Sequence, residues 1–201
     1  MIDAFYNRAF PTLEVDDQYI LREQEIKDTE AFFHYYSQAY DGRYIFANKP
    51  RNISEASAEI HYCRSLFRYR RGIYWTLARK ADDVMIGAIG MHINNQHHRA
   101  EICYDLDPKY WCQGITTRAM QKVIDHCFLP NVGMQRIEAI TVPENIASVA
   151  VLKKLDFEFE GKLRRYRYFD GKSHDIVMYS IINPDPIIHT NYLYSKPGVY
   201  I

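Results

Sequence analysis

The sequence predicts a single α/β domain with a mixed, mostly antiparallel sheet that carries helices on both faces. The chain has 201 residues, of which 47% are hydrophobic and 14% aromatic, and this composition suits one sizeable core. Strand-like and helix-like hydrophobic periods also alternate along the chain. Their order is strand, two helices, three strands, helix, strand, helix and hairpin, which is typical of a mixed sheet.

The first half of the domain is expected to hold one strand, two helices and a three-stranded meander. Residues 1–18 show no regular period and are interpreted as an N-terminal extension. Asp28 is expected to cap the first helix and Ser54 the second. The helices are predicted at 28–39 and 54–69, and the strands at 19–22, 73–79, 84–93 and 98–107.

The second half is expected to add two helices, a strand and a hairpin. Asn145 is a suitable cap for the last helix, and Asp170-Gly171 is a suitable hairpin turn. The domain then spans 19–182, and the proline- and tyrosine-containing segment 183–201 is interpreted as an extended tail. The predicted elements are a helix at 114–129, a strand at 136–142, a helix at 145–155 and strands at 157–167 and 174–182.

Charge and cysteine content exclude several classes of function. Lys plus Arg and Asp plus Glu both number 25, so there is no electrostatic case for binding nucleic acid. No apolar run is long enough to span a membrane, and the N-terminus lacks the features of a signal peptide. The cysteines have no metal-binding spacing, which favours reduced thiols in a cytoplasmic protein without a metal. They are Cys63, Cys103, Cys112 and Cys127.

The segment 110–120 joins the end of a predicted strand to the start of a predicted helix. Gly114, Thr116 and Thr117 stand where that helix begins. A helix start presents unpaired N–H groups, and a small residue lets a phosphate approach them. The segment therefore predicts an anion site, such as one for a nucleotide pyrophosphate, although a plain strand-to-helix turn would look the same. It matches neither a Walker loop nor a dinucleotide fingerprint.

Three blocks of sequence carry a resemblance to a known family. Residues 99–104, Arg-Ala-Glu-Ile-Cys-Tyr, match the strand pattern Ala-Glu-Ile-Gly-Tyr. Residues 110–119, Tyr-Trp-Cys-Gln-Gly-Ile-Thr-Thr-Arg-Ala, are similar to Tyr-Trp-Gly-Lys/Gln-Gly-Tyr/Ile-Ala/Met-Thr-Glu-Ala. Residues 145–157 match Asn-x-x-Ser-x-x-Val-Leu-Glu-Lys-Leu-Gly-Phe. Over residues 19–182 the chain thus resembles the GNAT acetyltransferase family, and more closely its RimJ/RimL-type branch, which acetylates ribosomal-protein N-termini and other amines.

Three of the positions at which the chain departs from these patterns bear on the pyrophosphate loop and the end of the last helix. Cys112 and Asp156 each stand where the branch has glycine, and Thr116 stands where it has alanine or another residue. We expect Asp156 to adopt the left-handed conformation that glycine serves at a helix end. Cys112 is expected either to narrow the loop or to require another backbone conformation.

The resemblance implies that acetyl-CoA lies between two parallel strands that splay apart, here 101–107 and 136–142. Asn145 would bind the pantetheine side while also capping its helix. Backbone groups that would pair with the pantetheine arm belong to Tyr104, Asp105 and Leu106. Amides that would hold the pyrophosphate belong to Gln113, Gly114, Ile115, Thr116 and Thr117.

Acyl transfer to an amine needs a base, a stabilised oxyanion and a donor for the departing thiolate. The resemblance favours Glu101 as the base, with a structural strand carboxylate as the alternative. Ser148, one helical turn after Asn145, is the expected donor, although it could simply close that turn. Tyr104 and Tyr166 are reserve donors, and backbone N–H groups near 104–106 could hold the oxyanion.

The expected function is transfer of acetyl from acetyl-CoA to a primary amine by direct attack in a ternary complex. The alternative is a catalytically inactive CoA-binding sensor of the same fold. A covalent route through Cys112, with His92, His97, His98 or His126 as its base, is not favoured because no spacing links them. Segment 41–52 could wall the acceptor site or anchor to the core, and the protein is expected to be a monomer or homodimer.

Overall fold

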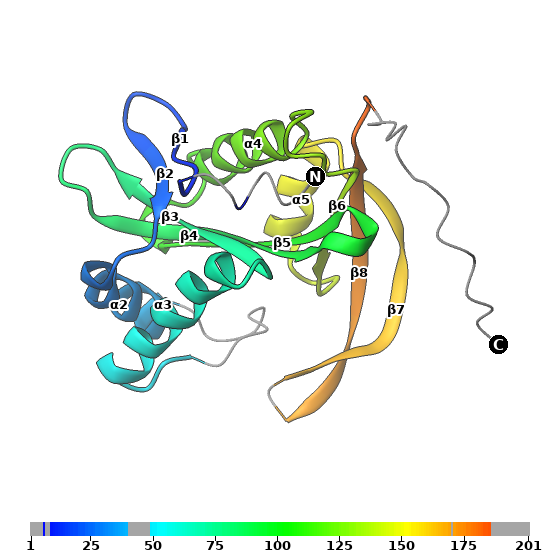
Figure 1. Cartoon of the computed structure of the whole chain (residues 1–201). Helices are drawn as coiled ribbons and strands as arrows, with labels where there is room; N and C mark the ends of the chain where they lie inside the picture. The colour runs from blue at the N-terminus through cyan, green and yellow to red at the C-terminus, as the bar shows by residue number, and fades with distance from the viewer. Residues whose placement is uncertain (1–5, 7–8, 40–48, 170, 186–201) are drawn as a thin grey trace.

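Eight strands form one mixed sheet in the order β1-β2-β3-β4-β5-β6-β8-β7. The computed structural model describes residues 6, 9–39, 49–169 and 171–185. Helices α2 and α3 cover one face of the sheet, and α4 and α5 cover the other (Figure 1). Strands β5 and β6 run parallel, whereas the other neighbouring pairs of the described sheet run antiparallel. The predicted fold class is therefore confirmed.

The observed elements agree closely with the predicted order. The strands are β1 (Leu13–Glu14), β2 (Tyr19–Glu23), β3 (Gly72–Arg79), β4 (Met85–Asn94), β5 (Arg99–Leu106), β6 (Arg136–Thr141), β7 (Glu158–Phe169) and β8 (Lys172–Ile182). The α-helices are α2 (Thr29–Ala39), α3 (Ile53–Arg68), α4 (Ile115–Cys127) and α5 (Ile146–Lys154), and short 3₁₀ helices lie at Ile26–Asp28, Asn95–His97 and Pro108–Tyr110. None of the described helices is both long and apolar enough to cross a bilayer.

Part of the N-terminal segment belongs to the sheet, so the prediction of an irregular segment over 1–18 was wrong there. Strand β1 pairs with β2, with Leu13 opposite Leu21. The indole Nε1 of Trp75 also donates to the carbonyl of Pro11 at 2.7 Å. Residues 41–48 of the segment 41–52, which was expected to wall the acceptor site or anchor to the core, lie outside the described residues, as does the tail after Asp185.

Two of the predicted helix caps were wrong, and one was right. Helix α3 is capped by Asn52, whose side chain accepts from the amide of Glu55 at 2.9 Å, and not by Ser54. Asp28 is buried, and its carboxylate accepts from Arg22, from the amide of Glu25 and from Thr76. It therefore fixes a neighbouring strand and a 3₁₀ turn, and does not cap α2. Asn145 caps α5 as predicted.

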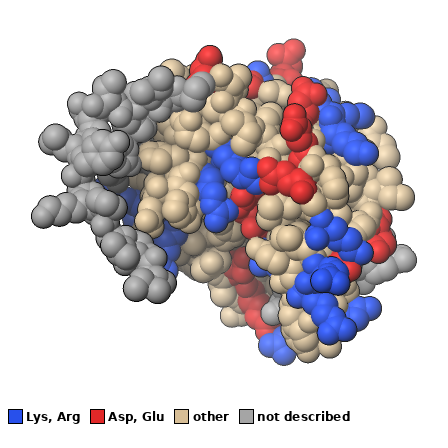
Figure 2. All heavy atoms as spheres, turned by 90° about the vertical axis from the view of Figure 1, so that its right-hand side faces the viewer, with Lys and Arg blue, Asp and Glu red and all other residues tan. Residues whose placement is uncertain are grey.

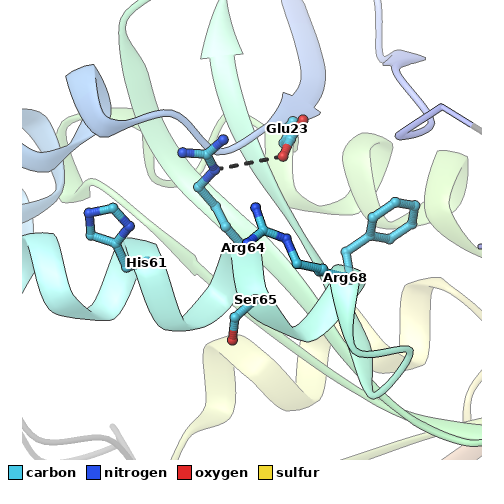
Figure 3. Close-up of a pocket in the computed structure, with 6 residues that line it drawn as sticks. Glu23, His61, Arg64, Ser65 and Arg68 are labelled. Carbon is cyan, nitrogen blue, oxygen red and sulfur yellow. Dashed lines mark ion pairs between the residues drawn. The ribbon is translucent and has the colours of Figure 1, made fainter.

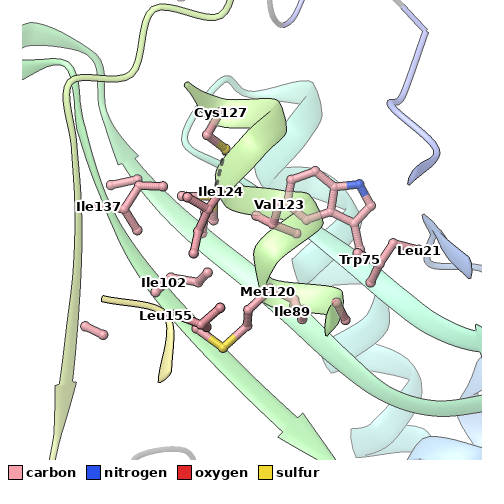
Figure 4. Close-up of a cluster of buried hydrophobic side chains, with 14 of the residues drawn as sticks. Leu21, Trp75, Ile89, Ile102, Met120, Val123, Ile124, Cys127, Ile137 and Leu155 are labelled. Atoms are coloured by element: carbon pink, nitrogen blue, oxygen red, sulfur yellow. Dashed lines mark hydrogen bonds between the residues drawn. The ribbon is translucent and has the colours of Figure 1, made fainter. Parts of the chain in front are cut away.

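The main core lies between the sheet and helices α4 and α5 (Figure 4). The apolar residues of α4 recur every three or four positions and are all buried, as the helical period requires. They pack against buried strand residues such as Ile89, Ile102 and Ile137. A smaller cluster beneath α2 and α3 includes Tyr35, Ile60 and Ala88. Both faces of the sheet are thereby covered, and the buried face of α4 packs on the sheet that contains β5.

Successive side chains of β5 point to opposite faces of the sheet. Ala100, Ile102 and Leu106 join the core beneath α4 and α5. Asp105 instead bonds to Tyr35 of α2 on the other face. Among the predicted site residues of β5, Leu106 therefore lies in the main core, whereas Asp105 lies on the face covered by α2.

Candidate active site

The parallel strands β5 and β6 separate after three paired positions. Their register runs from Arg99 opposite Arg136 to Glu101 opposite Glu138. Strand β5 then continues to Leu106 and β6 to Thr141 without further pairing between them. The expected splay is confirmed, and it leaves room beside β5 for an extended ligand to pair as an added strand. The carbonyl of Leu106 already accepts from the indole of Trp111 at 2.8 Å.

The start of α4 has the features of an anion site. Its N-cap is Gly114, at φ 70°, and none of the described side chains caps the amides of the first turn. A Cβ at this position would lie 3.3 Å from Nη1 of Arg118. The left-handed conformation and the close guanidinium both favour glycine here. Thr116 and Thr117 in this turn are half-buried, and Gln113 is exposed before it.

Cys112 adopts the left-handed conformation that a glycine would serve. Its φ is 60° and its side chain is exposed. Cys112 thus has a conformation that suits glycine, and the expectation that it requires another backbone conformation is not confirmed. Asp156 has φ 58°, so the expected left-handed helix end is confirmed. Such a conformation costs a non-glycine residue about 1–2 kcal/mol, with aspartate better suited than cysteine.

Replacement of Cys112 by glycine is expected to stabilise the protein by about 1 kcal/mol, because it relieves this strain. Urea unfolding of wild type and Cys112→Gly measures the change. Cys112→Ser is the matched control, since it removes the thiol but keeps a Cβ in the left-handed region. Equal stabilisation by serine and glycine would show that the thiol, and not the backbone, is the unfavourable element.

Ser148, Tyr104 and Asn145 form one hydrogen-bonded group. The hydroxyls of Tyr104 and Ser148 lie 2.7 Å apart, and the amide of Ser148 donates to Oδ1 of Asn145 at 3.1 Å. Burial raises the pKa of the Tyr104 phenol to about 12, although the hydrogen bond to Ser148 acts in the other direction. Tyr104 is therefore protonated at neutral pH and can donate to Ser148. The two residues that the sequence offered as alternative donors are thus joined.

Glu101 lies in an ion pair that the sequence did not predict. Its Oε1 accepts from Nη2 of Arg167 at 2.8 Å. Among the described contacts, its other oxygen has no partner and can receive a proton. The hairpin of β7 and β8 extends past the sheet on the side of α2 and α3 (Figure 1). Arg167 belongs to β7 of this hairpin and contacts Glu101 from there. Glu101 and Ser148 belong to separate hydrogen-bonded groups, because Glu101 pairs with Arg167 whereas Ser148 bonds to Tyr104 and Asn145.

Further polar side chains gather beneath α2 and α3. The phenol of Tyr35 donates to Asp105 at 2.6 Å, and burial raises the pKa of that carboxyl to about 6. Nearby, the Tyr74 hydroxyl lies 2.9 Å from Nε2 of His92 and 3.1 Å from Sγ of Cys103. The sequence predicted only a backbone role for Asp105. Its acidic type within an apolar strand was the signal that could have indicated a paired side chain.

The alternative nucleophile Cys112 and the reserve donor Tyr166 fit the geometry poorly. Cys112 has no hydrogen-bond partner among the described residues, and His92 is engaged by Tyr74. Tyr166 is exposed on β7, where Arg167 lies 5.9 Å from its ring centroid. His174 stacks on Phe169 with ring centroids 3.7 Å apart. His174 therefore packs on β7 within the hairpin.

The lining of a hollow of about 330 Å³ includes none of these residues. The hollow is lined by α3 and the end of β2, and Arg64 there approaches Glu23 at 3.6 Å (Figure 3). It contains none of the predicted site residues. Lys and Arg side chains gather at the lower end of the face shown in Figure 2, which includes the β7–β8 hairpin. Within the described ranges, no three His, Cys, Asp or Glu side chains are grouped to hold a metal ion.

Comparison with known proteins agrees with this geometry. The family model described as an acetyltransferase (GNAT) domain matches residues 18–158. An uncharacterized N-acetyltransferase of Bacillus subtilis, YoaA, is 36% identical over 176 residues, covering 87% of this chain and 98% of its own.

Two solved structures share the fold. The crystal structure of a probable acetyltransferase has a TM-score of 0.76 at 27% identity, covering 86% of this chain and 97% of its own. RimL, a ribosomal L7/L12 α-N-protein acetyltransferase solved with coenzyme A, has a TM-score of 0.77 at 20% identity, covering 87% of this chain and all of its own. The sequence match, the splayed strands and the uncapped helix start together show that this chain belongs to the GNAT acetyltransferase family and is an acetyl-CoA-dependent acetyltransferase.

Proposed function

We propose that this protein transfers the acetyl group of acetyl-CoA to a primary amine by direct attack in a ternary complex. The observation that carries the proposal is the Tyr104–Ser148 hydroxyl pair, which joins the diverging part of β5 to α5. The acceptor is a protein N-terminus or a small-molecule amine. The cytoplasmic location and the monomeric or homodimeric state stay predictions.

The cosubstrate is proposed to bind along the open side of β5 and onto the start of α4. Backbone groups of Tyr104, Asp105 and Leu106 would pair with the pantetheine arm, and the carbonyl of Leu106 is already in use by Trp111. The pyrophosphate would lie on the amides of 113–117, which no side chain in the described part of the chain caps. Asn145 uses Oδ1 for its cap, so its Nδ2 is the group proposed to meet the pantetheine.

In the proposed mechanism, Glu101 is the base for the incoming amine and Ser148 is the acid for the departing thiolate. Glu101 takes the proton of the incoming ammonium, directly or through water, with the carboxylate oxygen that Arg167 does not hold. The neutral nitrogen attacks the thioester carbon, and backbone N–H groups near Tyr104 stabilise the oxyanion. The C–S bond breaks, Ser148 protonates the thiolate, and Tyr104 passes its proton to Ser148. The second proton of the attacking nitrogen leaves to water as the amide forms, and a proton from water restores the Tyr104 phenol.

An amine panel tests this proposal. Purified protein is incubated with acetyl-CoA and either free-N-terminus peptides, N-terminally blocked lysine peptides or small amines, and free thiol release is measured. We expect release that depends on an unblocked amine, and α-amino groups are favoured mildly because their pKa is near 8 against about 10.4 for lysine. Binding of acetyl-CoA without turnover on any amine would support the inactive sensor instead.

A further inference from the structure

Arg118 stands at the edge of the proposed pyrophosphate site, where the family motif quoted above has a glutamate. It lies in the first turn of α4, and helical side chains point back toward the helix start. Its Nη1 donates to the carbonyl of Gln113 at 3.0 Å and lies beside Gly114. A cation therefore stands at the end of the helix that is already electropositive.

Asp16 holds this guanidinium from the connection between β1 and β2. Its Oδ2 accepts from Nε of Arg118 at 2.9 Å, while its Oδ1 accepts from the amides of Gln18 and Tyr19. Burial acts to raise the pKa of Asp16, but these donors outweigh it and lower the pKa. The carboxylate is therefore ionised at neutral pH and fixed by backbone bonds, so Arg118 is preorganised.

The remaining donors of Arg118 are available to a ligand. A guanidinium has five N–H groups in a rigid fork, and the two contacts above use one from Nε and one from Nη1. The side chain is 45% exposed, and the described residues offer no acceptor to Nη2. Such a fork can donate two parallel hydrogen bonds to two oxygens of one phosphate. The ammonium group of a lysine cannot supply this paired arrangement.

We propose that Arg118 binds a phosphate group of CoA and that Asp16 positions it. The inference rests on the proposed acetyl-CoA site and adds a side-chain contact to its backbone cradle. The phosphate is either the pyrophosphate or the 3′-phosphate of the adenosine, which present the same chemistry to a guanidinium. The N-terminal strand thereby becomes part of the cosubstrate site through Asp16.

Calorimetric titration of Arg118→Gln tests the proposal with three ligands. We expect the Kd for CoA to rise about tenfold, as for loss of one charge-assisted contact. We expect no change for acetyl-pantetheine, which lacks the phosphates. If 3′-dephospho-CoA also loses about tenfold, the contact is to the pyrophosphate; if the variant and wild type bind it equally, the contact is to the 3′-phosphate.

Two controls separate this role from a structural one. Lys122→Gln removes an exposed cation one turn further along α4 and should change the Kd for CoA by less than about twofold. Asp16→Asn breaks the same ion pair but keeps the guanidinium, so it should weaken binding by less than about threefold.

The proposal is overturned if Arg118→Gln binds CoA as wild type does, or if Asp16→Asn weakens CoA binding as much as Arg118→Gln does. It is also overturned if acetyl-pantetheine binding falls as far as CoA binding. If the wild-type protein binds no CoA at all, it is the proposed function that fails.

Discussion

Ser148→Ala is expected to lower kcat about a hundredfold while the KM for acetyl-CoA changes little. Ser148 is proposed to protonate the departing thiolate, a contribution made only as the C–S bond breaks. General acid catalysis contributes about 10²–10⁴-fold, and the lower end applies because a thiol with a pKa near 8.5 is already a good leaving group. Steady-state kinetics with the best amine of the panel measure both constants.

Tyr104→Phe should give a similar loss, because the two hydroxyls lie 2.7 Å apart and are proposed to act as one donor. The double variant should then be no slower than the slower single variant, which is the signature of residues that act as a unit. Tyr166→Phe is the matched control, since that exposed phenol was the other reserve donor, and its rate should stay at the wild-type value. Multiplying losses in the double variant would show that the two hydroxyls act independently.

The helices and the loop at Gly114 could be predicted because the information for them is local. The apolar residues of α4 repeat at a helical period, and that period alone fixes which side meets the sheet. The caps show the limit of local information. Asn52 and Ser54 are both suitable residue types two positions apart, and the helix begins where Asn52 reaches the amide of Glu55.

The partners of the candidate catalytic residues could not be predicted because they depend on distant packing. The sequence places Tyr104 on a half-apolar strand but does not say which helix covers it, and Ser148 comes 44 residues later. The contact between Arg167 and Glu101 is even harder to predict from the sequence. The register of β7 against β8 shifts between Leu163 and Arg167, and Arg165 has φ 51°. Such an irregularity breaks the two-residue alternation, so the strand pattern cannot tell which way Arg167 faces.

Glu101→Gln is expected to lower kcat/KM at pH 7 by about 10²–10³-fold, because glutamine cannot accept the proton of the incoming ammonium. The loss should shrink as pH rises toward the pKa of the acceptor, about 8 for an α-amine and about 10.4 for a lysine, since more of the amine is then already neutral. A pH profile of kcat/KM for wild type and variant, with the same acceptor, measures this. A loss that stays constant with pH would assign Glu101 to another role.

The contact with Arg167 lets the same experiment separate a base from a structural carboxylate. Glu158→Gln removes an exposed carboxylate of β7 and should leave the profile unchanged. Arg167→Gln keeps the base but frees its orientation, so we expect a loss of only about tenfold, with Glu101 still responsible for the pH dependence. If Glu101 merely fixed the hairpin, Glu101→Gln and Arg167→Gln would lower kcat/KM by equal factors. Acetyl-CoA binding would then weaken in parallel with the rate. Unequal losses with an unchanged Kd for acetyl-CoA would instead identify Glu101 as the group that receives the proton.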